Sequence, residues 1–184
     1  MNLPAHRVEE MISSEALRER VDALVEAMAA QLVTQNLVIV GVLRGSFMFL
    51  ADLVRSLQRH HLHPRIDFMT LQSYGGGTVS SGNVRILKDI SVDVEGADVL
   101  LVDDILDSGR TLRFAVRHIE NKNAARVFTC CLLNKPARRA VDVAADFIGF
   151  DIPDTFVVGY GLDYDSHYRE LPFLGQVVHD CPQP

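Results

Sequence analysis

Three short, mostly apolar runs constrain the fold of this chain more than any other feature of its sequence. They are residues 37–42 (LVIVGV), 97–102 (ADVLLV) and 125–133 (ARVFTCCLL). Runs of this length that are rich in valine, leucine and isoleucine are typical of strands buried on both faces, as in a parallel sheet. Parallel neighbours need a crossover connection, which is usually a helix. The sequence therefore predicts an α/β fold with a mostly parallel central sheet.

Amphipathic segments lie between these runs, where a parallel sheet requires helices. Residues 13–33 carry apolar side chains at steps of three and four, which predicts a helix with Ser13 or Ser14 as its N-cap. The helical period returns over residues 46–59 and from about Thr111 to Lys122. Shorter strands are expected at residues 65–72, 84–88, 146–150, 156–160 and near 177–178. We expect one domain over residues 1–184, with helices flanking the sheet and a small hood made by the chain-terminal segments.

The charge of the chain limits its partners. The formal net charge is −6, which disfavours binding to nucleic acid, because that binding depends on clustered lysine and arginine. Arg138 and Arg139 form a basic cluster that is too small for such a footprint. An anionic small molecule is compatible with this charge if helix N-termini, a few basic side chains and metal ions hold it.

Cysteine usage and the lack of long apolar stretches predict a cytoplasmic location. Cys130 and Cys131 are adjacent in an apolar run, where a strand points them to opposite faces, so they cannot easily pair with each other. We expect reduced thiols, as in a cytoplasmic protein. The first residues, MNLPAHRVEEM, contain no apolar region typical of a signal peptide. The longest apolar stretches are too short to span a bilayer, so no membrane association is expected.

The densest chemical signal is LLVDDILDSGRTL, residues 100–112. Ligands of α/β sheets bind at the carboxyl ends of strands, and Asp103 and Asp104 are expected to stop a buried strand here. With Asp107 they place three like charges within five positions, which indicates a ligand or a metal. Asp103 and Asp104 can accept hydrogen bonds from vicinal sugar hydroxyls, directly or through hydrated Mg²⁺, while Asp107 faces a reacting base. A solvated turn with an aspartate N-cap is the alternative for the short DSG element alone.

The residues that follow Asp107 suit a phosphate. They lead into a helix, whose free backbone N–H groups and positive dipole end favour an anion. Gly109 lets the backbone approach a ligand closely. Ser108 and Thr111 can donate hydroxyl hydrogen bonds, and Arg110 can add charge. Each of these residue types therefore has a use if a phosphorylated sugar binds here.

This segment resembles the phosphoribosyl pyrophosphate binding motif of type I phosphoribosyltransferases: four apolar residues, two acidic residues, then D-[ST]-G-x-T. From about Val38 to Val178, the chain further resembles the hypoxanthine-guanine phosphoribosyltransferases. The resemblance implies the type I phosphoribosyltransferase fold and Mg²⁺. It implies transfer of the 5-phosphoribosyl group from phosphoribosyl pyrophosphate to N9 of a 6-oxopurine, giving IMP or GMP and pyrophosphate in purine salvage. It also implies a homodimer or homotetramer.

Two further segments resemble loops that act on phosphoribosyl pyrophosphate. Leu43, Arg44 and Gly45 occupy the places of the pyrophosphate loop, where the family usually has Leu-Lys-Gly with a cis peptide before the lysine. The arginine departs from this pattern, and whether the Leu43–Arg44 peptide is cis is left open. Ser73 and Tyr74, in SYGGGTVSSGN, match the Ser-Tyr pair of the family's flexible catalytic lid. Lid closure would exclude water from a reactive sugar cation.

The C-terminal half resembles the family's purine site. Lys135 matches the lysine that hydrogen-bonds the purine O6, although a lysine at a strand end is by itself more often a surface charge. Phe156, which alone would be expected in the core, matches the stacking residue, and Val157 offers backbone groups to the base. Ile105 is assigned to the base as well. Asp163 and Arg169 match a second Mg²⁺ ligand near the purine and a pyrophosphate contact, although Asp163 alone suggests a surface turn. The implied metal ligands are thus Asp103, Asp104 and Asp163.

Asp107 is the candidate catalytic residue, as a general base or charge stabiliser at N7 of the purine. One alternative is a regulator that keeps this fold and binds nucleic acid. Another is a transferase for xanthine, adenine or a pyrimidine. Lys135 followed by Phe156-Val157-Val158-Gly159-Tyr160 favours a 6-oxopurine, because lysine only donates hydrogen bonds and so rejects the 6-amino group of adenine. The preference among hypoxanthine, guanine and xanthine is left open.

Overall fold

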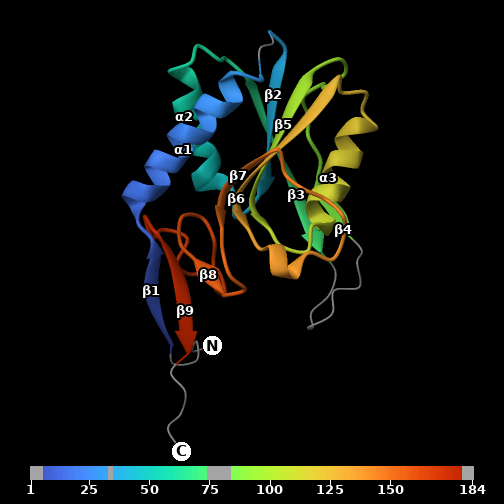
Figure 1. Cartoon of the computed structure of the whole chain (residues 1–184). Coiled ribbons are helices and arrows are strands. Elements are labelled where there is room, and N and C mark those ends of the chain that lie inside the picture. The colour runs from blue at the N-terminus through green and yellow to red at the C-terminus, as the bar shows by residue number, and fades with distance from the viewer. Residues whose placement is uncertain (1–5, 33–34, 74–83, 180–184) are drawn as a thin grey trace, which may run out of the picture.

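A six-stranded sheet forms the centre of the computed structural model, which describes residues 6–32, 35–73 and 84–179 (Figure 1). The strand order is β4-β3-β2-β5-β6-β7. The strands are β2 (Leu37–Leu43), β3 (Arg65–Ser73), β4 (Val84–Lys88), β5 (Asp98–Leu106), β6 (Arg126–Asn134) and β7 (Phe147–Asp151). All neighbours in this sheet are parallel except β3 and β4, which confirms the predicted α/β fold.

Helices cover both faces of this sheet. Helices α1 (Ser14–Ala29) and α2 (Phe47–Gln58) lie on one face, and α3 (Arg110–Glu120) lies on the other (Figure 1). Because side chains alternate along a strand, Ile39 packs into the core with α1 and α2, whereas its neighbour Val40 packs with α3. Ser13 is the N-cap of α1, since its hydroxyl accepts a hydrogen bond from the Ala16 amide.

The two ends of the chain form the predicted hood. Strands β1 (His6–Ile12), β9 (Leu174–His179) and β8 (Val157–Val158) make an antiparallel sheet in the order β1-β9-β8, beside the central sheet (Figure 1). No strand was expected at β1, since HRVEEMI lacks a clear alternation. Its strand conformation comes from pairing with β9 at the far end of the chain.

The sequence-based end of β5 was wrong. Asp103 and Asp104 do not stop this strand, which continues to Leu106 because its parallel ladder with β6 continues, pairing Asp103 with Cys131 and Leu106 with Asn134. Ladder hydrogen bonds here outweigh the low strand propensity of aspartate. Conversely, β8 is shorter than the predicted strand over 156–160, because Gly159 and Tyr160 have positive φ angles of 94° and 49°.

Cys130 and Cys131 are buried and form no disulfide, as expected. No helix within the described residues is long and apolar enough to cross a membrane. The remaining one-turn element is a 3₁₀ helix, η1 (Pro136–Arg138), which directly follows Lys135. That residues 1–184 form one domain stays a prediction.

Candidate active site

A cavity of about 710 Å³ lies between the hood and the carboxyl ends of β2, β3, β5 and β6. Its lining includes most of the residues predicted from the sequence: Leu43, Arg44, Gly45, Asp104, Ile105, Asp107, Lys135, Phe156, Val157, Asp163 and Arg169. Among the described residues, Asp103 and the stretch 108–111 are not part of this lining. Ser73 is the last residue of β3, and Tyr74 lies outside the described residues. The structure thus brings both halves of the predicted site to one cavity.

The turn after β2 packs tightly against Asp104. The Leu43–Arg44 peptide is cis. At Gly45, a Cβ atom would lie 1.6 Å from Oδ2 of Asp104, so any larger residue here would require the Asp104 side chain to move. Gly161, with a φ angle of 103°, packs on the other side, where a Cβ would lie 2.2 Å from the Gly45 carbonyl oxygen. The position of the Asp104 carboxylate therefore depends on two glycines.

Substitution of Gly45 by alanine is expected to displace the Asp104 carboxylate and so to lower kcat/KM by roughly 10- to 100-fold, since a misplacement of about 1 Å can cost this much. The matched control is Gly96→Ala, at a turn with a φ angle of 64° where an added Cβ meets nothing within 4 Å. That variant is expected to lose only stability, through backbone strain. Steady-state kinetics and thermal unfolding of both variants check this, and a normal kcat/KM for Gly45→Ala would contradict it.

Asp103 and Asp104 lie in a strongly desolvated region. Asp103 is 5% exposed, and burial, followed by the charge of Asp104, raises its pKa well above the ordinary value. Burial also raises the pKa of Asp104, although hydrogen bonds to Asp103 and Ile105 and the charge of Arg169 act in the opposite direction. Because successive side chains of β5 point to opposite faces, only Asp104 reaches the cavity wall. This carboxylate would gain from a cation or a hydroxyl donor in the cavity.

Asp163 faces the same cavity and already has a cationic partner. Its Oδ1 lies 2.5 Å from Nη2 of Arg169, and its Oδ2 accepts a hydrogen bond from the Ser166 amide at 2.7 Å. No group of three or more His, Cys, Asp or Glu side chains within the described residues is arranged to hold a metal ion. Mg²⁺ commonly binds through one or two carboxylates together with substrate phosphates. Asp104 and Asp163 fit this second mode of binding.

The base side of the cavity combines a buried lysine with an exposed ring. Lys135 is only 8% exposed, its Nζ donates to the Thr155 carbonyl at 2.6 Å, and burial lowers its pKa, opposed by Asp107 and Asp154. Lys135 is therefore not a surface charge, which was the alternative to a role in purine binding. Phe156 is 52% exposed on the cavity wall, so its interpretation as a core residue was wrong. Its ring packs edge-on against Tyr164 at 5.3 Å.

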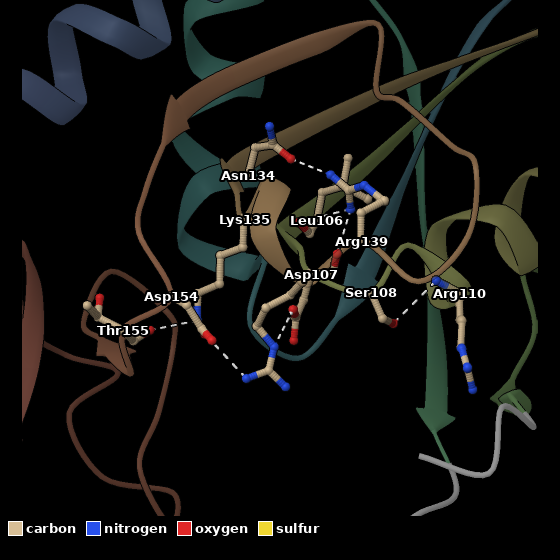
Figure 2. A network of polar contacts seen from close by, with 10 residues as sticks. Leu106, Asp107, Ser108, Arg110, Asn134, Lys135, Arg139, Asp154 and Thr155 are labelled. Atoms are coloured by element: carbon tan, nitrogen blue, oxygen red, sulfur yellow. Dashed lines mark hydrogen bonds and ion pairs between the residues drawn. The ribbon is translucent and has the colours of Figure 1, made fainter. Parts of the chain in front are cut away.

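Two arginines that the sequence reasoning assigned no role hold Asp107. Arg138 Nε lies 2.9 Å from Oδ1 of Asp107, and Arg139 Nη1 donates to the carbonyl oxygens of Asp107 and Leu106 at 2.6 and 3.2 Å. Figure 2 shows Asp107, Lys135 and Asp154 facing a common space, with Arg139 on the side of Leu106 and Asn134. The sequence indicates a role for Arg138 and Arg139 only by placing them three and four positions after Lys135.

The turn at the start of α3 differs in part from the expectation. Gly109 adopts the left-handed conformation with a φ angle of 82°, and a Cβ there would lie 2.4 Å from Val143, so its close approach is to the protein itself. Arg110 points away from Asp107 (Figure 2) and lines a separate hollow of about 300 Å³ with Arg113 and Arg117. Helix α3 begins at Arg110, so the stretch that follows Asp107 does lead into a helix, as predicted.

The chain is similar to known proteins over most of its length. A family model described as "Phosphoribosyl transferase domain" matches residues 13–165. The hypoxanthine phosphoribosyltransferase of Salmonella typhimurium is 46% identical over 175 residues, which cover 94% of this chain and 97% of that protein. The hypoxanthine-guanine phosphoribosyltransferase of Dictyostelium discoideum is 44% identical over 80% of this chain and 82% of its own. A crystal structure of a hypoxanthine-guanine phosphoribosyltransferase from Bacillus anthracis superposes with a TM-score of 0.87 at 42% identity. The superposition covers 92% of this chain and 98% of that one.

Proposed function

The chain belongs to the phosphoribosyltransferase family, among its hypoxanthine and hypoxanthine-guanine enzymes, and from this premise we propose which residues carry out the reaction. The enzyme transfers the 5-phosphoribosyl group of phosphoribosyl pyrophosphate to hypoxanthine or guanine in purine salvage. One observation carries the assignment of residues: a single cavity is lined by Asp104, Asp107 and the buried Lys135. A nucleic-acid-binding regulator is not favoured.

The phosphoribosyl half of the substrate binds along β5 and the start of α3. Backbone N–H groups of residues 107–111, with the hydroxyls of Ser108 and Thr111, hold the 5-phosphate at the positive end of the helix dipole. Asp104 accepts hydrogen bonds from the ribose hydroxyls, whereas Asp103, which the sequence predicted for the same role, does not line the cavity. Arg110 adds positive charge nearby, at the cost of a side-chain movement, because it now points to another hollow.

The pyrophosphate half binds between the loop after β2 and the hood. Leu43, Arg44 and Gly45 present backbone N–H groups, and Arg169 supplies charge from the opposite wall. Ser73 and Tyr74 belong to the lid that closes over the sugar and excludes water.

The base binds on the wall made by β6 and β8. Lys135 has three donors, of which one is used by Thr155, so its ammonium group can donate to the purine O6. Phe156 stacks on the ring, and Ile105 contacts its other side. Val157 offers backbone groups to the purine, and Asp163 lines the same cavity. This arrangement favours a 6-oxo group over a 6-amino group.

In the reaction, the bond from C1′ to the pyrophosphate oxygen breaks, its electron pair leaves with pyrophosphate, and N9 donates its lone pair to C1′. Asp107 takes up the proton that the base loses, at N7, or stabilises the positive charge there. Substrate positioning by the cavity supplies much of the remaining acceleration.

Mg²⁺ is the divalent ion that we infer for this site, with Asp104 and Asp163 as the residues that would hold it, while Asp103, the third ligand predicted from the sequence, lies outside the cavity lining. The ion would neutralise charge on pyrophosphate, because Lys135, Arg138 and Arg169 in the lining already contact Thr155, Asp107 and Asp163. We also infer a homodimer or homotetramer, a cytoplasmic location, and no association with nucleic acid or membranes.

A side-by-side assay of five bases tests the function. With phosphoribosyl pyrophosphate and Mg²⁺, we expect nucleotide formation from hypoxanthine or guanine, and no more than background from adenine and uracil, with xanthine as the informative intermediate case. Addition of a chelator to the same reactions is expected to abolish turnover. Turnover of adenine or uracil above that of both 6-oxopurines would overturn the assignment.

A further inference from the structure

Arg138 is the last residue of η1, three positions after Lys135, and it contacts Asp107 across the cavity wall. Its Nε lies 2.9 Å from Oδ1 of Asp107, and its Nη1 lies 3.3 Å from Oδ1 of Asp154. The guanidinium group therefore joins the candidate catalytic carboxylate to the segment that carries the base-stacking ring. The function proposed above assigns Arg138 no role.

The contact is asymmetric at the carboxylate of Asp107. Its Oδ1 is fully buried and has no well-directed hydrogen bond, so Arg138 acts on it mainly through charge. The side chain as a whole is 39% exposed, which leaves Oδ2 as the oxygen available to a ligand. Arg138 thus contacts the buried oxygen of this carboxylate.

The backbone of Asp107 is held independently. Arg139 donates to its carbonyl oxygen at 2.6 Å (Figure 2). The Ala140 amide donates to the carbonyl oxygen of Ser108 at 3.0 Å. Loss of Arg138 alone would therefore free the carboxylate to rotate while the loop stays in place. This separation makes the side-chain orientation testable without unfolding the site.

Stability does not explain the Arg138 contacts. The side chains of Arg138, Asp107 and Asp154 are 51%, 39% and 51% exposed, and ion pairs in such surroundings contribute little to folding. The pair does matter electrostatically, because the charge of Asp107 is the largest cause that raises the pKa of Arg138. A contact with little value for folding, placed on the reacting group, points to a role in the reaction.

We propose that Arg138 is a positioning residue for the phosphoribosyl transfer: it shields Oδ1 of Asp107 and thereby presents Oδ2 to N7 of the purine. Asp154 holds Arg138 from the opposite side. This inference rests on the proposed role of Asp107.

The experiment compares Arg138→Ala, Arg138→Lys and Asp154→Asn in the full chain, with Arg18→Gln on α1 as a control for loss of an ion-paired surface arginine. Kinetics with hypoxanthine at saturating phosphoribosyl pyrophosphate and Mg²⁺ give kcat and both KM values, and thermal unfolding reports stability. We expect Arg138→Ala to lower kcat by roughly tenfold, as a misdirected reacting group does, with KM for phosphoribosyl pyrophosphate and the melting temperature unchanged. Arg138→Lys should retain more of kcat, and Asp154→Asn should show a smaller loss.

Chemical rescue separates orientation from structure. Because Arg138 is half-exposed, added methylguanidinium can enter its place and should restore part of kcat in Arg138→Ala, but not in Asp107→Asn. An unchanged kcat in Arg138→Ala, or a loss that lysine does not relieve and methylguanidinium does not rescue, overturns the inference. If Asp107→Asn loses turnover while Arg138→Ala does not, only this inference fails. If neither variant loses turnover, the proposed role of Asp107 fails with it.

Discussion

Replacement of Asp107 by asparagine is expected to lower kcat by roughly 10²- to 10⁴-fold, the contribution of a well-placed proton acceptor. Asparagine keeps the size of the side chain but cannot accept a proton or balance positive charge at N7. Because the backbone of Asp107 is held by Arg139, the cavity should keep its shape. KM for hypoxanthine and for phosphoribosyl pyrophosphate should therefore change by less than about threefold, the pattern of an interaction made only in the transition state.

Steady-state and single-turnover kinetics with hypoxanthine measure this loss, and single turnover separates chemistry from product release. The matched control is Asp142→Asn, an exposed carboxylate on the segment after η1 that does not line the cavity. That variant should keep the parental kcat. A parental kcat in Asp107→Asn would remove this residue from the chemistry.

Replacement of Lys135 by methionine is expected to raise KM for hypoxanthine by roughly 10- to 100-fold, since hydrogen bonds from charged groups contribute about 1.5–3 kcal/mol. Methionine keeps much of the apolar stem of the side chain and removes its donors. The preference for hypoxanthine over adenine should decrease in parallel, because the site then no longer distinguishes an acceptor from a donor at position 6. The melting temperature should not fall, since the variant no longer buries an ammonium group.

Competition assays with hypoxanthine and adenine, together with thermal unfolding, check both parts. The matched control is Lys122→Met, which removes a lysine whose Nζ lies 3.0 Å from Asp89, away from the cavity lining. Its kinetic constants should equal those of the parent. A Lys135→Met protein that is less stable yet keeps its affinity for hypoxanthine would assign this lysine a structural role only.

Most of the regular structure could be read from local patterns. The runs at β2 and β6 are mostly apolar because helices cover both faces of the sheet, and each run indicates this burial by its own composition. The parallel arrangement then predicts that residues after these strands meet at one edge, which is why Gly45 and Lys135 line one cavity.

Local patterns failed where a distant partner decides the conformation. Strand β1 exists because β9 pairs with it, and β5 continues past Asp104 because β6 offers a ladder there. The same limit applies to the site. Gly161 was not selected as a site residue, since its importance lies in the contact of its α-carbon with the carbonyl of Gly45, far away in the sequence.

Periodicity and the order of the elements were enough to predict the α/β fold, the edge of the sheet at which the chemistry lies, and the types of group gathered there, because burial and strand direction follow from them. The folded structure was needed to show that Asp104 and not Asp103 reaches the cavity wall, that Lys135 is buried, and that Arg138 contacts Asp107. These facts depend on the pleat of a strand and on contacts between segments, for which no short stretch of sequence carries the information.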